Sequence, residues 1–246
     1  MTLHEDLVKS GNWLFRWRSY LPLFFVPILI SGLLEFDYPN NSHTYHLIWG
    51  IICLSVSFLG LLVRCYTIAH VPKRTSGRNT KGQKADSLNK TGMYSLMCNP
   101  LYFGNFLMFL GVTLFVRLWW VSVIYGLVFW LYYERIILAE EAFLKEEYGK
   151  DYLDYAKRTP AFIPNFKNWE PPNLPFSFRH IPKREYSAFF AMIASFTVLE
   201  FAADCIVTGK PTIDKVWLCL FLVGLGAYLT LRMLKKRTRI LHLEGR

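Results

Sequence analysis

The sequence predicts an all-α, multi-pass integral membrane protein with about six transmembrane helices. Hydrophobic residues make up 53% of its 246 residues and charged residues only 19%, which is low for a soluble protein of this length. Several apolar segments approach the roughly 20 residues that a helix needs to cross a bilayer core about 30 Å thick. We place the six spans near residues 20–35, 46–66, 100–116, 118–138, 187–204 and 215–233.

The distribution of Lys and Arg gives these spans an orientation. Basic residues are concentrated in both terminal segments, the 71–91 loop and the 139–186 stretch, whereas the 36–46 loop has none and the 205–214 loop has few. Cytoplasmic loops carry an excess of Lys and Arg. We therefore expect both termini on the cytoplasmic side of the membrane, and a bacterial inner membrane is the expected location. This distribution also makes anionic lipid headgroups, rather than nucleic acid, the expected partner of the net charge of +10.

No motif in the sequence predicts a metal site. The five cysteines form no CxxC pair, and most lie in apolar runs, as is typical of buried thiols. His43 and His46, in the sequence HTYH, are expected to lie in a loop at the membrane interface rather than to bind a metal.

Residues 139–157 predict a helix that continues from the fourth span. Apolar and aromatic residues recur there at about helical spacing among charged ones, which indicates an amphipathic helix at the cytoplasmic interface. The segment that follows is rich in Pro and aromatic residues, and we expect it to be an ordered loop against the membrane face.

The third span has an unusually polar beginning. Proline favours the first turn of a helix and disfavours helical geometry in the residue before it, so the helix is expected to begin at Pro100. Free N–H groups at a helix start can bind a carboxylate, glycine lets a ligand approach the backbone, and tyrosine rings can face a cation. The alternative is an ordinary helix start. The candidate binding residues here are Gly92, Tyr94, Asn99, Pro100, Tyr102 and Gly104.

Three glutamates, Glu134, Glu140 and Glu141, follow the fourth span on the same predicted side of the membrane. Carboxylates near the end of a membrane helix are costly unless they are solvated or paired. They are either interfacial charges paired with Arg or Lys, or part of a pocket in which Glu140 and Glu141 bind a cationic or hydroxyl-rich ligand.

Taken together, these patterns resemble the isoprenylcysteine carboxyl methyltransferase and phospholipid methyltransferase superfamily. Its G-x-Y…R-H-P-x-Y-x-G block is similar to Gly92-x-Tyr94 followed by Asn99-Pro100-Leu101-Tyr102-x-Gly104. Its E-E-x-x-L…F-G-x-x-Y-x-x-Y…F-I-P ending is similar to Glu140-Glu141-x-Phe143-Leu144, Tyr148-Gly149-x-x-Tyr152-x-x-Tyr155 and Phe162-Ile163-Pro164. One departure is Cys98-Asn99, where the superfamily has Arg-His.

The resemblance divides the chain into three parts. Residues 1–46 would hold the N-terminal segment and first span, and residues 47–165 a methyltransferase-like core of three spans and the interfacial helix. Residues 166–246 would hold a cytoplasmic loop, the last two spans and the basic tail.

The resemblance also implies a membrane methyltransferase that uses S-adenosylmethionine. The cofactor would enter from the cytoplasm and the acceptor from the lipid, and no metal is required. Glu140 and Glu141 would hold the cofactor's ammonium group or ribose diol, the helix start at residues 99–104 its carboxylate, and Tyr94 or Tyr102 would lie near the sulfonium.

The basic 71–91 loop indicates which kind of molecule accepts the methyl group. Its GRNT…Q…LN…TG run resembles a bacterial branch of lipid A 1-phosphate O-methyltransferases, and arginine is well suited to bind phosphate. We expect Lys73, Arg74 and Arg78 to bind the acceptor, with Arg78 and Glu140 as the catalytic candidates. An anionic acceptor needs no strong base, whereas an amine must lose a proton. Since His70 is the only nearby histidine, O-methylation of a membrane lipid or lipidated acceptor is favoured.

Three alternatives stay open. The chain could be an isoprenylcysteine carboxyl or phospholipid N-methyltransferase. It could be a non-catalytic transporter or scaffold with a degenerate methyltransferase fold, which Cys98-Asn99 favours. It could also resemble the sterol reductases, which share a similar core but carry a nicotinamide-binding segment that we do not find here. The oligomeric state is also left open.

Overall fold

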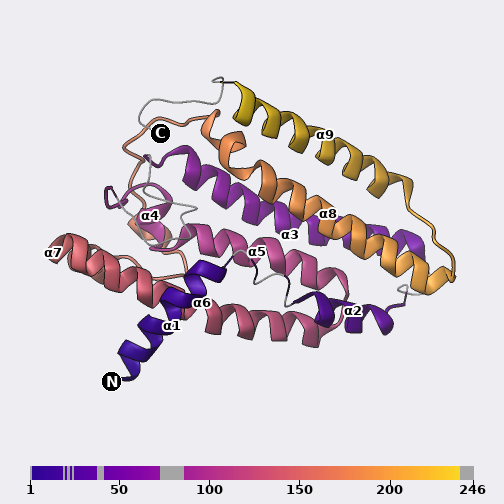
Figure 1. Cartoon of the computed structure of the whole chain (residues 1–246), viewed down its shortest axis with the longest axis horizontal. Coiled ribbons are helices and arrows are strands. Elements are labelled where there is room, and N and C mark those ends of the chain that lie inside the picture. The colour runs from indigo at the N-terminus through magenta and orange to yellow at the C-terminus, as the bar shows by residue number, and fades with distance from the viewer. Residues whose placement is uncertain are drawn as a thin grey trace.

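The computed structural model describes residues 2–18, 20, 23, 25–37, 42–72 and 86–238, and within them every regular element is a helix. The all-α prediction is therefore confirmed. The elements, labelled in Figure 1, are α1 (Leu3–Trp17), α2 (Val26–Leu34), α3 (His43–Ala69), α4 (Met93–Leu96), α5 (Pro100–Phe115), α6 (Trp119–Tyr148), α7 (Lys150–Arg158), the 3-10 helix η3 (Phe166–Asn168), α8 (His180–Thr208) and α9 (Lys215–Arg237).

Four of the described helices, α3, α6, α8 and α9, are long and apolar enough to cross a membrane, and each matches a predicted span. The third predicted span is α5, a shorter apolar helix of 16 residues.

The predicted first span, residues 20–35, differs from the structure. Its helix α2 has only nine residues, or about 14 Å, which is too short for a bilayer core. Pro27 lies in the first turn of α2, the position in a helix where proline is tolerated.

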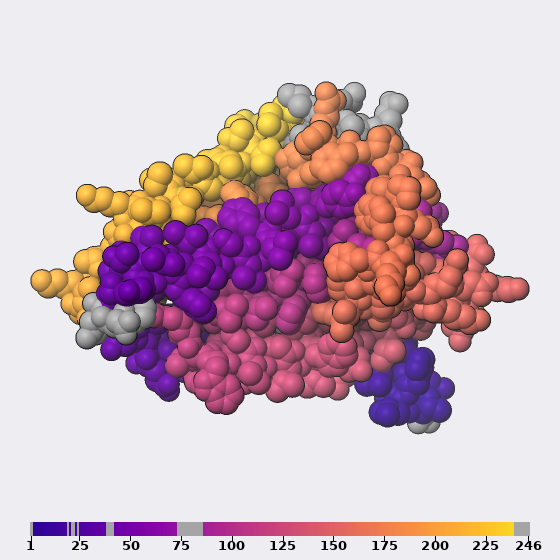
Figure 2. Space-filling view, turned by 180° about the vertical axis from the view of Figure 1, so that it is seen from behind, coloured from indigo at the N-terminus to yellow at the C-terminus, as the bar shows by residue number. Residues whose placement is uncertain are grey.

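The long helices form one bundle in which α5 occupies a central place. Helix α3 packs against α5 and α8, α5 also packs against α6, α9 packs on the outer side of α8, and α1 packs against α6. We call the end of the bundle where α4 and α7 lie the α4 end, and the opposite end, where α2 lies, the α2 end (Figure 1). Figure 2 shows the segment before α8, in orange, lying over the α4 end of α3. The Ser177 N–H donates to the Ala69 carbonyl there, at 3.1 Å.

Two buried apolar clusters hold the bundle, and α5 contributes to both. One lies between α3, α5, α8 and α9, where the Phe196 and Trp217 rings stack with centroids 5.8 Å apart. The other lies between α1, α5 and α6, where the Phe129 and Tyr133 rings stack at 4.2 Å. The position of α5 is therefore fixed from both sides.

Helix α6 continues well beyond the predicted fourth span, as expected, but the predicted helix over 139–157 is not continuous. Helix α6 ends at Tyr148, and α7 begins at Lys150. Gly149 between them has φ +52°, a left-handed conformation that other residues rarely adopt. Helix α7 is amphipathic, with Tyr152 and Tyr155 buried and Lys150 exposed, so the predicted amphipathic pattern is confirmed.

The expectation that His43 and His46 lie in a loop is wrong. Both belong to the first turns of α3, and His46 is fully buried. Its ring packs between Phe36 and Phe115, with both centroid distances 5.2 Å.

Helices α3 and α5 approach each other closely because glycines line their interface. A Cβ atom added to Gly60 would lie 2.7 Å from the Met108 nitrogen and still closer to the Gly104 carbonyl oxygen. A Cβ added to Gly104 would lie 2.5 Å from the Arg64 Cγ. Small residues allow this kind of close backbone contact between membrane helices. The Ser57 hydroxyl adds a hydrogen bond across the interface, to the Met108 carbonyl at 2.7 Å.

We expect Gly60→Ala to lower the free energy of unfolding by about 1–3 kcal/mol, because the new methyl group meets backbone atoms that cannot move aside. Unfolding of the protein in detergent micelles measures this change. The control is Gly126→Ala, in α6, where an added Cβ meets no atom within 4 Å. Equal stability of the two variants would contradict the close contact between α3 and α5.

Candidate functional site

The two halves of the sequence motif meet at the α4 end. Three backbone hydrogen bonds join them. The Gly92 N–H donates to the Glu170 carbonyl at 2.9 Å, and the Cys98 N–H donates to the Pro160 carbonyl at 2.9 Å. The Asn165 N–H donates to the Leu96 carbonyl at 3.0 Å. The segment after α7 is therefore held along the segment that leads into α5. Phe162, from the predicted F-I-P stretch, packs against Phe103 with ring centroids 5.6 Å apart.

Gly92 forms the turn into α4. Its φ is +64°, and a Cβ there would lie 3.3 Å from the Pro172 Cγ. The Ser95 hydroxyl donates to the Gly92 carbonyl at 2.7 Å and accepts from the Glu170 N–H at 3.0 Å. The structure thus gives Gly92 a role in backbone geometry, and its contact with a cofactor stays a prediction.

Helix α5 begins at Pro100, as predicted, with Asn99 as the residue before its first turn. The Asn99 side-chain amide donates to the Ala161 carbonyl at 3.0 Å, and the Cys98 thiol donates to the Thr159 carbonyl at 3.4 Å. The two residues that depart from the Arg-His of the resemblance therefore bind the segment after α7 through its backbone carbonyls.

Tyr102 and Glu140 form the central contact of the candidate site. Tyr102 lies in the first turn of α5, and its hydroxyl donates to the Glu140 Oε1 at 2.9 Å. The Tyr102 ring packs on Tyr133 of α6, with centroids 4.7 Å apart. Arg18, which follows α1, is the positive charge that acts on Glu140. This carboxylate is thus held in a defined place between α5 and α6.

The two predicted glutamates, Glu140 and Glu141, have different surroundings, and their joint binding of a cofactor stays a prediction. Consecutive residues of a helix point about 100° apart. Glu140 contacts Tyr102, whereas Glu141 lies near enough to Cys98 and Tyr152 to act on them electrostatically. Glu134, nearly two turns earlier in α6, is exposed.

Tyr94 is a further aromatic group near Glu140. Burial raises the pKa of the Tyr94 hydroxyl, and the Glu140 charge raises it further, so the phenol stays neutral at physiological pH. The Tyr94 carbonyl accepts a hydrogen bond from the Tyr155 hydroxyl at 2.7 Å, which connects α4 to α7.

A buried polar network next to this site was not found by sequence reasoning. Arg64 of α3 binds Glu185 of α8 through two parallel hydrogen bonds, Nε to Oε2 at 2.8 Å and Nη2 to Oε1 at 2.7 Å. Its Nη1 donates to the Asn105 side chain of α5 at 2.6 Å, and the Asn105 amide contacts the Tyr133 hydroxyl at 3.4 Å.

The sequence holds a weak signal for this network. Arg64 ends an otherwise uncharged run of residues 47–63, and Glu185 is an acidic residue in a basic flank. The predicted second span, residues 46–66, includes Arg64 near its end. Gly104 also belongs here, because the Arg64 side chain crosses it, which gives Gly104 a packing role.

The predicted acceptor residues Lys73, Arg74 and Arg78 lie outside the described residues. Of the two catalytic candidates, the structure therefore describes Glu140. The arrangement around it, a half-buried carboxylate among tyrosine rings at a helix start, can bind a cationic ligand.

Comparison with known proteins supports the motif. A family model described as phospholipid methyltransferase matches residues 45–151. A protein-S-isoprenylcysteine O-methyltransferase of Dictyostelium discoideum is 30% identical over 172 residues, which cover 65% of this chain and 68% of that protein. The chain therefore belongs to the superfamily of isoprenylcysteine carboxyl methyltransferases and phospholipid methyltransferases.

Two other relatives have names of a different kind. A nickel-cobalt-cadmium resistance protein of Alcaligenes xylosoxydans xylosoxydans is 31% identical over 121 residues, 49% of this chain and 56% of that protein. A cobalt-zinc-cadmium resistance protein of Cupriavidus metallidurans is 32% identical over 119 residues, 48% of this chain and 55% of that protein. The chain thus spans a little over half the length of these two relatives. No solved structure matches the chain significantly.

We expect the Cys98 thiol to resist alkylation. Burial raises the pKa of Cys98 to about 11, and the Glu141 charge contributes in the same direction. Because the thiolate is the reactive form, the labelling rate should be low at pH 8 and should rise up to about pH 11. Mass spectrometry of peptides after iodoacetamide treatment measures this rate. The control is the same cysteine in denatured protein, and a folded-state rate that levels off by pH 9 would contradict the prediction.

Proposed function

We propose that this protein is a membrane-embedded, S-adenosylmethionine-dependent methyltransferase that O-methylates an anionic acceptor on a lipid or lipidated molecule. The observation that carries the proposal is the meeting of both motif halves at the α4 end, around the 2.9 Å contact between Tyr102 and Glu140. Family membership supports the reaction type. The proposed catalytic core, residues 47–165, overlaps the region matched by the family model.

The residues at the α4 end fit the chemistry of the cofactor. S-adenosylmethionine would supply an electrophilic methyl group, and it carries an ammonium, a carboxylate and a ribose diol. Glu140 would accept hydrogen bonds from the ammonium or the diol, with Glu141 next to it in the chain as a second acceptor. The start of α5 at Asn99 and Pro100 would face the carboxylate. Tyr94 and Tyr102 offer rings for the sulfonium, while Gly92 and Gly104 shape the backbone around them.

Methyl transfer would proceed by in-line displacement. The acceptor oxygen would form a bond to the methyl carbon while the bond from that carbon to sulfur breaks, so that the bonding electrons would stay on sulfur. The protein has mainly to align the reactants and exclude water, and alignment alone can account for several kcal/mol of rate enhancement. Tyr102, which is held by Glu140 and Tyr133, would serve this alignment.

The hydrogen bond made by His70 favours an oxygen acceptor over an amine acceptor. An amine must lose a proton to a base, but the His70 Nδ1 already contacts the Tyr66 carbonyl at 2.9 Å. A phosphate or carboxylate oxygen is anionic and needs no such base. The O-methyltransferase names of several relatives support this choice. The 1-phosphate of lipid A and the carboxylate of a prenylated cysteine are both acceptors of this class.

A second candidate is a non-catalytic membrane protein that retains the fold. The observation in its favour is that Cys98 and Asn99 bind the backbone carbonyls of Thr159 and Ala161. Cofactor binding separates the two candidates, because a scaffold or transporter has no reason to bind S-adenosylmethionine.

The test of the proposed function is calorimetric titration of the detergent-solubilised protein with S-adenosylmethionine. We expect the parent protein to bind, and Glu140→Gln to bind about ten- to a hundredfold more weakly, because a charge-assisted hydrogen bond contributes about 1.5–3 kcal/mol. Glu134→Gln, an exposed glutamate on the same helix, is the control. Absence of binding to the parent would favour the non-catalytic candidate, and equal binding by both variants would remove the role of Glu140.

The acceptor is tested separately by methyl transfer from labelled cofactor to extracted lipids. Arg78→Lys keeps the charge but loses the planar two-point contact with phosphate, so we expect slower transfer with unchanged cofactor affinity. Lys150→Ala, on the exposed face of α7, is the control and should transfer normally. Parental rates for both Arg78→Lys and Arg78→Ala would exclude Arg78 from acceptor binding, and lipid mass spectrometry would identify the methylated class.

A further inference from the structure

A second cluster of polar residues lies at the α2 end, far from the candidate cofactor site. Helix α3 runs for 27 residues, or about 40 Å, between the two ends. At the α2 end, His43 begins α3, Glu200 and Asp204 lie in the later part of α8, and Asp214 precedes α9. Three helices thus bring four potential metal ligands together.

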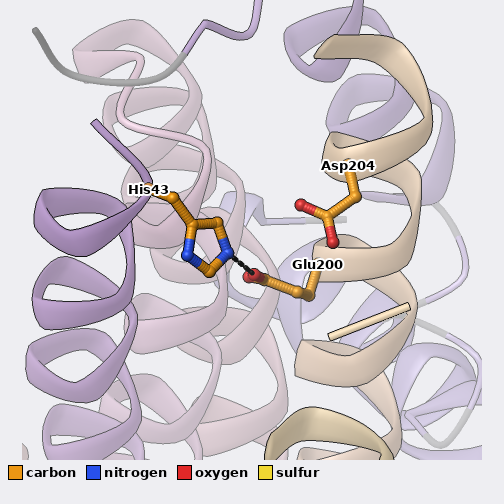
Figure 3. Close-up of side chains that lie close together, drawn as sticks. All are labelled: His43, Glu200 and Asp204. Carbon is orange, nitrogen blue, oxygen red and sulfur yellow. Dashed lines mark ion pairs between the residues drawn. The ribbon is translucent and has the colours of Figure 1, made fainter. Parts of the chain in front are cut away.

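The distances between these groups are short. The His43 Nε2 lies 3.9 Å from the Glu200 Oε1 and 4.0 Å from the Asp214 Oδ2. One ligand atom from each of His43, Glu200 and Asp204 lies within 4.8 Å of the others. Figure 3 shows His43 reaching from α3 toward Glu200, with Asp204 one turn further along α8 and on the same side.

The surroundings of Glu200 give an independent reason to expect a ligand at this cluster. Its side chain is 1% exposed, and its Oε2 lies 2.9 Å from the Nε2 of the buried His46. Its Oε1, the oxygen nearest His43, is buried and has no hydrogen-bond partner among the residues that the structure describes. A buried carboxylate oxygen is costly unless it is hydrogen-bonded, paired or bound to a metal.

The other charged groups that the structure describes here do not hydrogen-bond to this oxygen. Asp214 caps α9, because its Oδ1 accepts from the Val216 and Trp217 N–H groups at 2.8 and 3.3 Å. Its other oxygen is the one near His43. Arg117 acts on Glu200 electrostatically, but its Nη2 donates to the Asp37 carbonyl at 2.9 Å.

We propose that the α2 end binds a divalent transition cation of the Zn²⁺ class. The His43 Nε2, the Glu200 Oε1 and an Asp204 carboxylate oxygen form the ligand set, and the Asp214 Oδ2 is the fourth donor. One imidazole with carboxylates suits Zn²⁺, whereas Mg²⁺ and Ca²⁺ prefer oxygen ligands alone. His46 serves as a positioning residue, since it holds the Glu200 carboxylate by its other oxygen.

The geometry needs only a small contraction to hold the ion. Ligands about 2.0–2.1 Å from Zn²⁺ in a tetrahedral arrangement lie about 3.4 Å apart. His43 is 45% exposed and begins its helix, so its side chain has room to move toward the carboxylates. A bound cation would neutralise the two buried carboxylates and would join α3, α8 and α9. The site does not depend on the proposed methyltransferase activity.

The test uses Zn²⁺ alone with the full-length protein in detergent micelles, after removal of any affinity tag and treatment with EDTA. We expect calorimetry to show one tightly bound equivalent and the unfolding temperature to rise with added Zn²⁺. His43→Gln and Asp204→Asn should each weaken binding more than tenfold and abolish the temperature shift. His4→Gln, an exposed histidine of α1, is the control and should bind like the parent.

The choice of His43 for the decisive variant avoids a loss of folding. Glu200→Gln disturbs a buried pair and can unfold the protein, whereas the His43 side chain is partly exposed. X-ray absorption then identifies the ligand atoms, and we expect only nitrogen and oxygen. Sulfur ligands would assign the ion to cysteines, and that result would overturn the proposal. So would parental binding by His43→Gln, or the absence of saturable binding.

Discussion

The bidentate contact between Arg64 and Glu185 is the interaction on which the α4 end depends. It joins α3 to α8 within the bundle, and the third guanidinium nitrogen carries the connection to Asn105 of α5. Removal of one partner from a buried ion pair costs about 3–5 kcal/mol, because an unpaired charge is left behind. Through Asn105 the pair also holds α5, the helix whose first turn carries the Tyr102 that contacts Glu140.

Glycine at position 104 makes this arrangement possible. The Arg64 stem crosses α5 where a Cβ atom would stand, so the charge network and the close contact of α3 with α5 require each other. Gly104 thus has a packing role, and its contact with a ligand stays a prediction. Cys98 and Asn99 also have a structural role, because their side chains bind backbone carbonyls of the segment after α7. At positions 98 and 99, where the superfamily pattern has Arg-His, this chain has side chains that hydrogen-bond to backbone carbonyls.

The parts that could be predicted from the sequence are those with local signals. Pro100 marks a helix start by its own ring geometry, and the amphipathic pattern of α7 follows from the spacing of Tyr152 and Tyr155. The parts that could not be predicted depend on distant segments. Nothing near Arg64 in the chain indicates its partner Glu185, 121 positions away, and nothing in HTYH indicates that His46 would contact Glu200. The short α2 was missed because a hydropathy pattern does not show where a helix begins.

The length of α5 has a consequence for the surrounding membrane. Its 16 residues measure about 24 Å, roughly 6 Å less than a typical hydrocarbon core, while its neighbours α3 and α6 have 27 and 30 residues. A bilayer adapts to such hydrophobic mismatch by thinning locally. The start of α5, and with it Tyr102, would then lie in a depression where headgroups and acyl chains come within reach of the same few residues. An acceptor with a polar head and a greasy tail could enter sideways from the leaflet without being lifted out of it.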